Sequence, residues 1–211
     1  MAEHLSGPSI PVSLDLERHA FLTLIRMANT LSEPVDIAGQ LVILAQQLSG
    51  CEAVAIRLKS GPGFPYAASM GFPERFIVLE NELCATDEDG HLLRDEHRMP
   101  ILGCVCGRVL SGQLDRSLPF ITDRGSFVTT SVSNLLRSMS GSTAQPLGQT
   151  RNRCHTAGYE TVALFPIQRD QVTYGLIQCN DSRPNRLSPE SIDLMENLAS
   201  AAAHLFQLSM T

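Results

Sequence analysis

GYETVALFPIQRDQVTYGLIQCND, residues 158–181, contains the strongest strand pattern in the chain. Two runs rich in β-branched and other apolar residues are separated by the short polar segment Arg169-Asp170-Gln171, which is typical of a tight turn. The stretch therefore predicts two adjacent strands that form an antiparallel hairpin. The side chains expected to be buried are Val162, Leu164, Phe165, Tyr174, Leu176 and Ile177.

Helical patterns lie on both sides of this hairpin. Apolar residues recur with helical spacing over residues 15–31 and again after Pro34, where Gly50 is a suitable stop. After the hairpin, Ser188 precedes Pro189 as a predicted N-cap of the closing helix. Residues 51–58 and 65–72 read as two further strands. This order predicts an α+β fold, with a central antiparallel sheet and the N- and C-terminal helices packed on one face.

The middle of the chain, residues 81–158, has no regular pattern. We expect an irregular hairpin over residues 84–107, a short helix starting near residue 106, an extended piece at residues 124–127, a short helix at residues 131–139 and a mobile loop after it. Residues 1–13 contain two prolines and a glycine and are interpreted as a flexible leader. Residues 14–211 are then a single domain with an irregular, cysteine-bearing insertion.

Composition excludes several classes of protein. The net charge of −6 and the aromatic content of 5% argue against a nucleic-acid-binding surface, which needs a basic face. No apolar run reaches the roughly 18 residues of a membrane-spanning helix, so we expect no membrane segment. The start of the chain lacks the basic residues and apolar core of a signal peptide, so a cytoplasmic location is expected.

Several motifs together resemble a GAF domain, a small-molecule sensory module of bacterial signalling proteins. The predicted hairpin is similar to the last two central strands of that fold, and LSPESIDLMENLASAAA at residues 187–203 is similar to its closing helix. Residues 82–127, followed by RNRCHTAGYE at residues 151–160, resemble a cysteine-bearing GAF subgroup attached to sensor histidine kinases. The resemblance covers roughly residues 20–208. Val128-Thr129-Thr130 depart from the Trp-Thr-Asn that commonly follows GSF in this subgroup.

The resemblance implies a sensory, ligand-binding domain without catalytic activity. It implies a pocket for a small-molecule ligand lined by Gly125, Ser126 and Phe127, with Tyr159 as a further candidate. It also implies a homodimer formed through the terminal helices, and a histidine kinase or another output domain as partner. It does not identify the ligand.

The six cysteines fall into two groups. Cys51 and Cys179 lie in or beside strand-like runs and are interpreted as small buried apolar residues. The other four occur beside turn-forming or polar residues in the irregular middle. If the GCVCG stretch is extended, Cys104 and Cys106 point to the same side. The candidate set of metal ligands is Cys84, Cys104, Cys106 and Cys154, with His155 as an alternative ligand.

Four alternatives for these cysteines remain open at this stage. Four thiolates suit a structural zinc ion or an iron–sulfur cluster, and a haem held through a cysteine or histidine is a third kind of cofactor. A thiol–disulfide switch would join Cys84 to Cys104 or Cys106, or involve Cys154. Buried structural thiols are the fourth alternative.

An enzymatic alternative to the sensory function follows from the same cysteines. Arg108, Arg151 and Arg153 flank them, and a nearby guanidinium group favours the reactive thiolate. Certain free-standing GAF proteins reduce methionine sulfoxide, so a thiol-based redox enzyme is the second hypothesis. The acidic segment around His91 and His97 lacks the ligand order of a calcium loop and is interpreted as a solvated hairpin.

Overall fold

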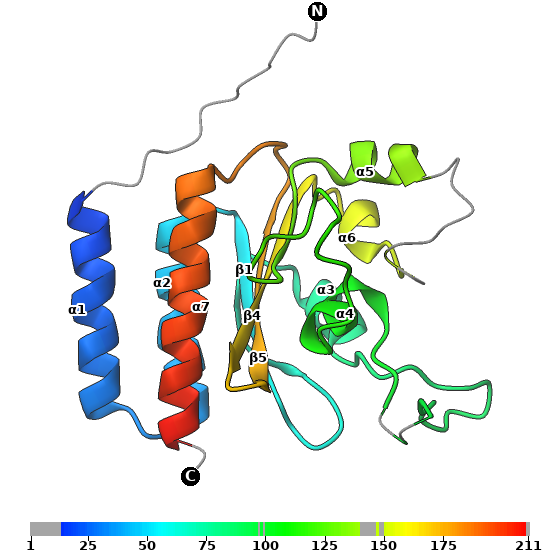
Figure 1. Cartoon of the computed structure of the whole chain (residues 1–211), viewed down its shortest axis with the longest axis horizontal. Helices are drawn as coiled ribbons and strands as arrows, with labels where there is room; N and C mark the ends of the chain where they lie inside the picture. Colours follow the sequence, from blue (N-terminus) through cyan, green and yellow to red (C-terminus); the bar gives the residue numbers. More distant parts are fainter. Residues whose placement is uncertain (1–13, 97, 99, 140–146, 148–149, 210–211) are drawn as a thin grey trace, which may run out of the picture.

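The computed structural model describes residues 14–96, 98, 100–139, 147 and 150–209. Its centre is a five-stranded antiparallel sheet with the strand order β2-β1-β5-β4-β3. Three long helices cover one face of the sheet and four short helices lie on the other side (Figure 1). The predicted α+β arrangement is therefore confirmed. The strands are β1 Ala53–Leu58, β2 Tyr66–Met70, β3 Phe127–Thr129, β4 Thr161–Arg169 and β5 Val172–Asp181.

The face covered by the long helices is called the helix face below. Helix α2 and the closing helix α7 pack on the sheet, and α1 packs on both of them. Gly50 ends α2 in the left-handed conformation, and the Oγ atom of Ser188 accepts a hydrogen bond from the Ser191 N–H at the start of α7, so both predicted helix signals are confirmed. The three helices are α1 Leu14–Thr30, α2 Pro34–Ser49 and α7 Pro189–Ser209.

The β4–β5 hairpin divides its side chains between the two faces. Asp170 and Gln171 both have positive φ at the turn, which is the geometry of a two-residue hairpin loop. Alternate residues of the strands then point to opposite faces. Phe165 and Ile177 enter the core beneath the long helices, whereas Leu164 lies in a second apolar cluster on the opposite side.

The opposite side, called the site face below, is covered by α3 Glu74–Glu80, α4 Cys104–Leu110, α5 Val132–Met139 and α6 Arg153–Thr156. The sequence predicted that residues 81–158 form an irregular insertion. Part of this stretch nevertheless belongs to the sheet, because β3 pairs with β4 through Phe127 and Leu164. The expected irregular hairpin is present as isolated bridges, including Thr86 with Leu92 and Arg94 with Pro100. The four-residue helix α6 was not predicted from the sequence.

Three sequence-based expectations concern residues outside the described part of the chain. These are the leader at residues 1–13, most of the loop after α5 and His97. Within the described ranges, no helix combines the length and the hydropathy that crossing a bilayer requires.

Candidate functional site

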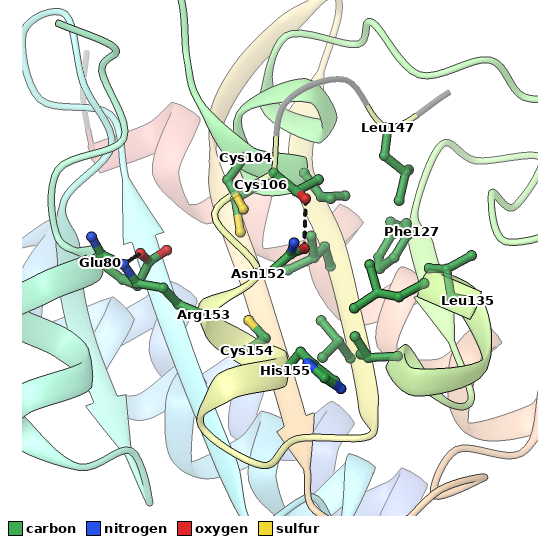
Figure 2. A pocket seen from close by; sticks show the side chains of 16 residues that line it. Glu80, Cys104, Cys106, Phe127, Leu135, Leu147, Asn152, Arg153, Cys154 and His155 are labelled. Carbon is green, nitrogen blue, oxygen red and sulfur yellow. Dashed lines mark hydrogen bonds and ion pairs between the residues drawn. The ribbon is translucent and has the colours of Figure 1, made fainter. Parts of the chain in front are cut away.

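A cavity of about 60 Å³ lies on the site face, enclosed by the sheet and by helices α4, α5 and α6 (Figure 2). Apolar side chains form most of its wall, and thiol, carboxylate and guanidinium groups gather along one margin. The lining residues are Glu80, Cys104, Val105, Cys106, Phe127, Val132, Leu135, Leu136, Leu147, Thr150, Asn152, Arg153, Cys154, His155, Val162 and Leu164.

Cys104 and Cys106 belong to the first turn of α4, so the expectation that they lie in an extended segment is wrong. In a regular helix, residues two positions apart point in different directions. Cys104 instead has φ +64°, and its sulfur lies beside that of Cys106 (Figure 2). The convergence that was expected from an extended chain thus arises from a left-handed residue at a helix start.

Gly107 allows this helix to lie close to the chain that precedes it. A Cβ atom on Gly107 would lie 2.6 Å from the carbonyl oxygen of Leu102, a distance that side-chain atoms do not tolerate. Gly112 has φ +65° just beyond the helix, where a turn needs a residue free to adopt that conformation. The two glycines of GCVCGRVLSG therefore serve to place α4 and to end it.

The two neighbouring thiols differ in acidity. A hydrogen bond from Cys106 is the main cause that lowers the pKa of Cys104 to about 6, and the backbone N–H groups of Arg151 and Val105 also donate to its sulfur. Burial and the charge of Glu80 act in the opposite direction without cancelling this effect. The same hydrogen bond, together with burial, raises the pKa of Cys106. Within the pair, the negative charge is therefore favoured on Cys104 rather than on Cys106.

Cys154 presents a third thiol to the cavity from helix α6. Burial is the main cause that raises its pKa to about 12, so it is a neutral thiol at physiological pH. The Nε2 atom of Gln178 approaches its sulfur at 3.9 Å and also donates to Asn180 Oδ1 at 3.2 Å. Beside Cys154, the Nε2 atom of His155 lies 3.2 Å from Ser133 Oγ at the rim of the cavity.

Two arginines and a buried carboxylate form the polar margin. Glu80 Oε1 lies 3.2 Å from Arg153 Nε and 3.5 Å from Arg151 Nη1. Arg151 Nη1 also donates to the carbonyl oxygen of Glu82 at 2.7 Å. Arg151 and Arg153 thus form ordinary ion pairs with Glu80, an acidic residue that the sequence analysis did not single out.

Arg57 is a site-face residue that sequence reasoning missed. It has no exposed surface, and its guanidinium group donates to the carbonyl oxygens of Phe64, Glu80 and Asn81. The group also lies 3.6 Å above the ring of Tyr66, whose hydroxyl donates to Gln178 Oε1 at 3.0 Å. Arg57, Tyr66 and Gln178 therefore form a row of polar side chains that leads toward Cys154. The sequence offered one sign of this buried charge: Arg57 is the single charged residue in the otherwise apolar strand AVAIRL.

The four predicted cysteine ligands are not all brought together. Cys84 pairs with Leu102 in the irregular hairpin, and its thiol donates to the carbonyl oxygen of Pro62 at 3.7 Å, away from the cavity lining. Burial, together with the adjacent Glu82, raises its pKa. The four sulfur atoms therefore do not form a ready tetrahedral set.

Among the described residues, the group of three or more potential ligand atoms within 4.8 Å of one another is Asp87, Asp89 and His91. All three are exposed. Asp87 Oδ1 accepts hydrogen bonds from the backbone N–H groups of Asp89 and His91, so the cluster also closes a turn, in agreement with the predicted solvated hairpin.

The residues carried over from the family pocket separate in the structure. Phe127 forms part of the cavity wall. The hydroxyl of Ser126 points to the other side of β3, where it donates to Glu196 of α7 at 2.6 Å. Gly125, with φ +87°, lies against Arg116, outside the cavity lining. Tyr159 also lies outside the lining and packs edge-on against Phe72 and Phe76.

Comparison with solved structures identifies the fold. The GAF domain of an Acinetobacter phosphoenolpyruvate-protein phosphotransferase superposes with a TM-score of 0.57 at 13% identity, over 92% of each chain. A free methionine-R-sulfoxide reductase from Neisseria meningitidis gives 0.58 at 12% identity, over 97% of each chain. A GAF domain/HD domain protein from Geobacter sulfurreducens gives 0.55 at 15% identity, over 87% of this chain and 97% of the other. No family model and no curated protein matches the sequence. The chain has a GAF-like fold.

Proposed function

We propose that this chain is a sensory domain that binds a small, largely apolar ligand in the cavity on the site face and passes the signal to an output partner through its terminal helices. The observation that carries the proposal is the enclosed apolar cavity with one polar margin. Ligand sites are commonly apolar clefts with a few converging polar groups. The GAF domains among the structural neighbours belong to larger signalling proteins, which supports the same function.

The wall of the cavity suggests the chemistry of the ligand. Phe127, Val162 and Leu164 offer contacts to a flat or branched apolar group. Arg153 and Asn152 at the margin can donate hydrogen bonds to a single polar end. A ligand with a compact apolar body and one acceptor group fits this distribution best.

Binding can be tested with indole as a small apolar probe. Titration of the whole chain should shift the methyl NMR signals of Leu135 and Leu164, and the variant Leu135→Trp should abolish the shift at Leu164 because the tryptophan side chain fills the cavity from α5. Val35→Trp, at an exposed position of α2, is the matched control and should bind as the parent does. Absence of shifts at millimolar indole, with no small molecule retained in native mass spectra, would exclude the proposal.

Signal output requires a surface beyond the cavity. Helix α1 leaves Phe21, Leu22 and Ile25 exposed although it packs on α2 and α7. A second copy of the chain could cover this apolar strip, as the predicted homodimer requires. Light scattering should give a dimer that Phe21→Glu dissociates, whereas Val78→Glu, exposed on α3 of the other face, should leave it intact. A parent protein that is monomeric at high concentration would contradict the dimer.

A bound metal or haem is a separate proposal for the same thiols. A four-thiolate zinc or iron–sulfur site does not fit the described arrangement unless Cys84 turns from Pro62 toward the cavity. Metal analysis combined with an absorption spectrum of anaerobically purified protein distinguishes zinc without colour, a sulfide-to-iron band and a Soret band. Protein without metal or colour would remove all three.

A thiol-based redox enzyme is the second candidate function. It is favoured by the ionised Cys104 beside a second thiol at the edge of an enclosed cavity. The sulfoxide reductase from Neisseria meningitidis has the same fold. Turnover of methionine sulfoxide with a thiol donor, lost in Cys104→Ser, would support this function, and absence of turnover by the fully reduced protein would remove it.

A further inference from the structure

We propose that Cys104 and Cys106 form a redox switch, in which a hydroperoxide oxidises the Cys104 sulfur and the Cys106 thiol then closes a disulfide between the two. The switch needs no ligand in the cavity, so it does not depend on the proposed sensory function. It also differs from the pairings considered at first, which joined one of these thiols to Cys84 or Cys154.

The geometry of α4 carries the proposal. The two sulfur atoms lie side by side, and Cys104 adopts a left-handed conformation at the start of the helix (Figure 2). Closing a disulfide therefore needs a short approach of two side chains and no rearrangement of the sheet. Cys104 is also the partly exposed member of the pair, whereas Cys106 is buried, so an oxidant meets Cys104 first.

The surroundings of Cys104 favour the anionic sulfur that attacks peroxides. It accepts hydrogen bonds from the Cys106 thiol and from the N–H groups of Arg151 and Val105. The charge of Glu80 of α3 opposes this ionisation. A charge on Cys104 in turn raises the pKa of Cys154 of α6.

The chemistry balances in two steps. The Cys104 thiolate attacks the outer peroxide oxygen: an S–O bond forms, the O–O bond breaks, the sulfur gives up two electrons and the leaving alkoxide or hydroxide takes a proton from water. Cys106 then loses its proton and attacks the sulfenic sulfur: the S–S bond forms, the S–O bond breaks and water leaves. Loss of the Cys104 charge in the first step removes one cause of the raised pKa of Cys106, which helps the second step.

The test uses the whole chain, reduced and freed of reductant, then treated with one equivalent of hydrogen peroxide, blocked with N-ethylmaleimide and digested with trypsin. The tryptic peptide of residues 99–108 contains both thiols and no other cysteine. It should appear unblocked and lighter by two hydrogen atoms, and dithiothreitol should restore it. In Cys106→Ser, dimedone should label Cys104 as a trapped sulfenic acid, and Cys84→Ser, whose thiol donates to Pro62 away from the cavity, should behave as the parent.

Three results would overturn the proposal: a disulfide that links residues 99–108 to the peptide of Cys154 or Cys84, oxidation of Cys51 and Cys179 at the same rate, or a peptide of residues 99–108 that is still fully blocked by N-ethylmaleimide after the peroxide treatment. The measurement on the parent protein decides the matter even if a serine variant fails to fold. Ligand binding plays no part in the readout, so failure of the switch and failure of the sensory proposal are distinguishable.

Discussion

Two pairs of neighbouring thiols lie on opposite faces of the same sheet, and the pKa shifts within the two pairs follow the same pattern. Cys51 and Cys179 share a hydrogen bond on the helix face, as Cys104 and Cys106 do on the site face, and in each pair the pKa of one thiol is lowered and that of the other raised. Their access to solvent differs: Cys51 is 2% exposed and Cys179 is 0% exposed, beneath α2 and α7.

The two pairs show that a lowered thiol pKa does not by itself make a cysteine reactive. A thiol can act as a nucleophile only where a reagent can reach it. The helix face is a continuous apolar core, whereas the site face contains a cavity and buried polar groups such as Arg57 and Gln178. We therefore propose that the helix face mainly supplies stability and that the site face holds the reactive groups, and each prediction below tests one part of that division.

The largest expected effect is on stability, at the centre of the helix face. Phe165 is completely buried in β4, and Phe165→Ala should lower the free energy of unfolding by about 4 kcal/mol through lost contacts and a new cavity. Its neighbour Leu164 borders the existing cavity, so Leu164→Ala should cost about 2 kcal/mol, at the lower end for such substitutions. Urea unfolding measures both, and equal losses would contradict the division between the faces.

The second effect concerns the buried charge of the site face. Arg57→Met removes the donors to three carbonyl oxygens and should destabilise the fold by about 3 kcal/mol, since each buried acceptor left without a partner costs about 1–3 kcal/mol. Arg57→Lys keeps the charge and N–H donors on a single nitrogen, so it should lose less. A stable Arg57→Met protein would show that the buried charge is tolerated rather than stabilising, which is known for some buried ion pairs.

The third effect compares the two thiol pairs directly. In native protein at pH 7, iodoacetamide should modify Cys104 at least about 100-fold faster than Cys51, which becomes accessible only when the core opens. The thiolate fraction grows as pH rises through the pKa, so the Cys104 rate should increase up to about pH 7 and then level off, with a midpoint near the pKa of about 6. In Cys106→Ala that midpoint should rise because the main cause of the lowered pKa is lost. Peptide mapping by mass spectrometry gives both rates, and similar rates would remove the distinction.

Sequence reasoning reached the helix face more fully than the site face. The hairpin, the Gly50 stop and the Ser188 cap depend on neighbouring residues and on alternation, so local pattern was sufficient for them. The convergence of Cys104 and Cys106 was predicted for the wrong reason, because the left-handed residue depends on how α4 packs against Leu102. Helix α6 is too short to have a periodic pattern, and the burial of Arg57 depends on carbonyl groups distant in the chain.

The smallest expected effect tests the correction at Ser126, which precedes β3 and turns toward the helix face while Phe127 turns toward the cavity. Ser126→Ala removes one of the two hydroxyl donors to Glu196, the other being Thr122, and should cost about 1 kcal/mol in urea unfolding. The alkylation rate of Cys104 should stay unchanged, because the hydroxyl is not part of the cavity wall. Phe127→Leu is the matched variant on the other side: it should change that rate, since it alters the wall itself. A changed alkylation rate of Cys104 in Ser126→Ala would mean that β3 couples the two faces. Stability and thiol reactivity could then no longer be assigned to separate faces of the sheet.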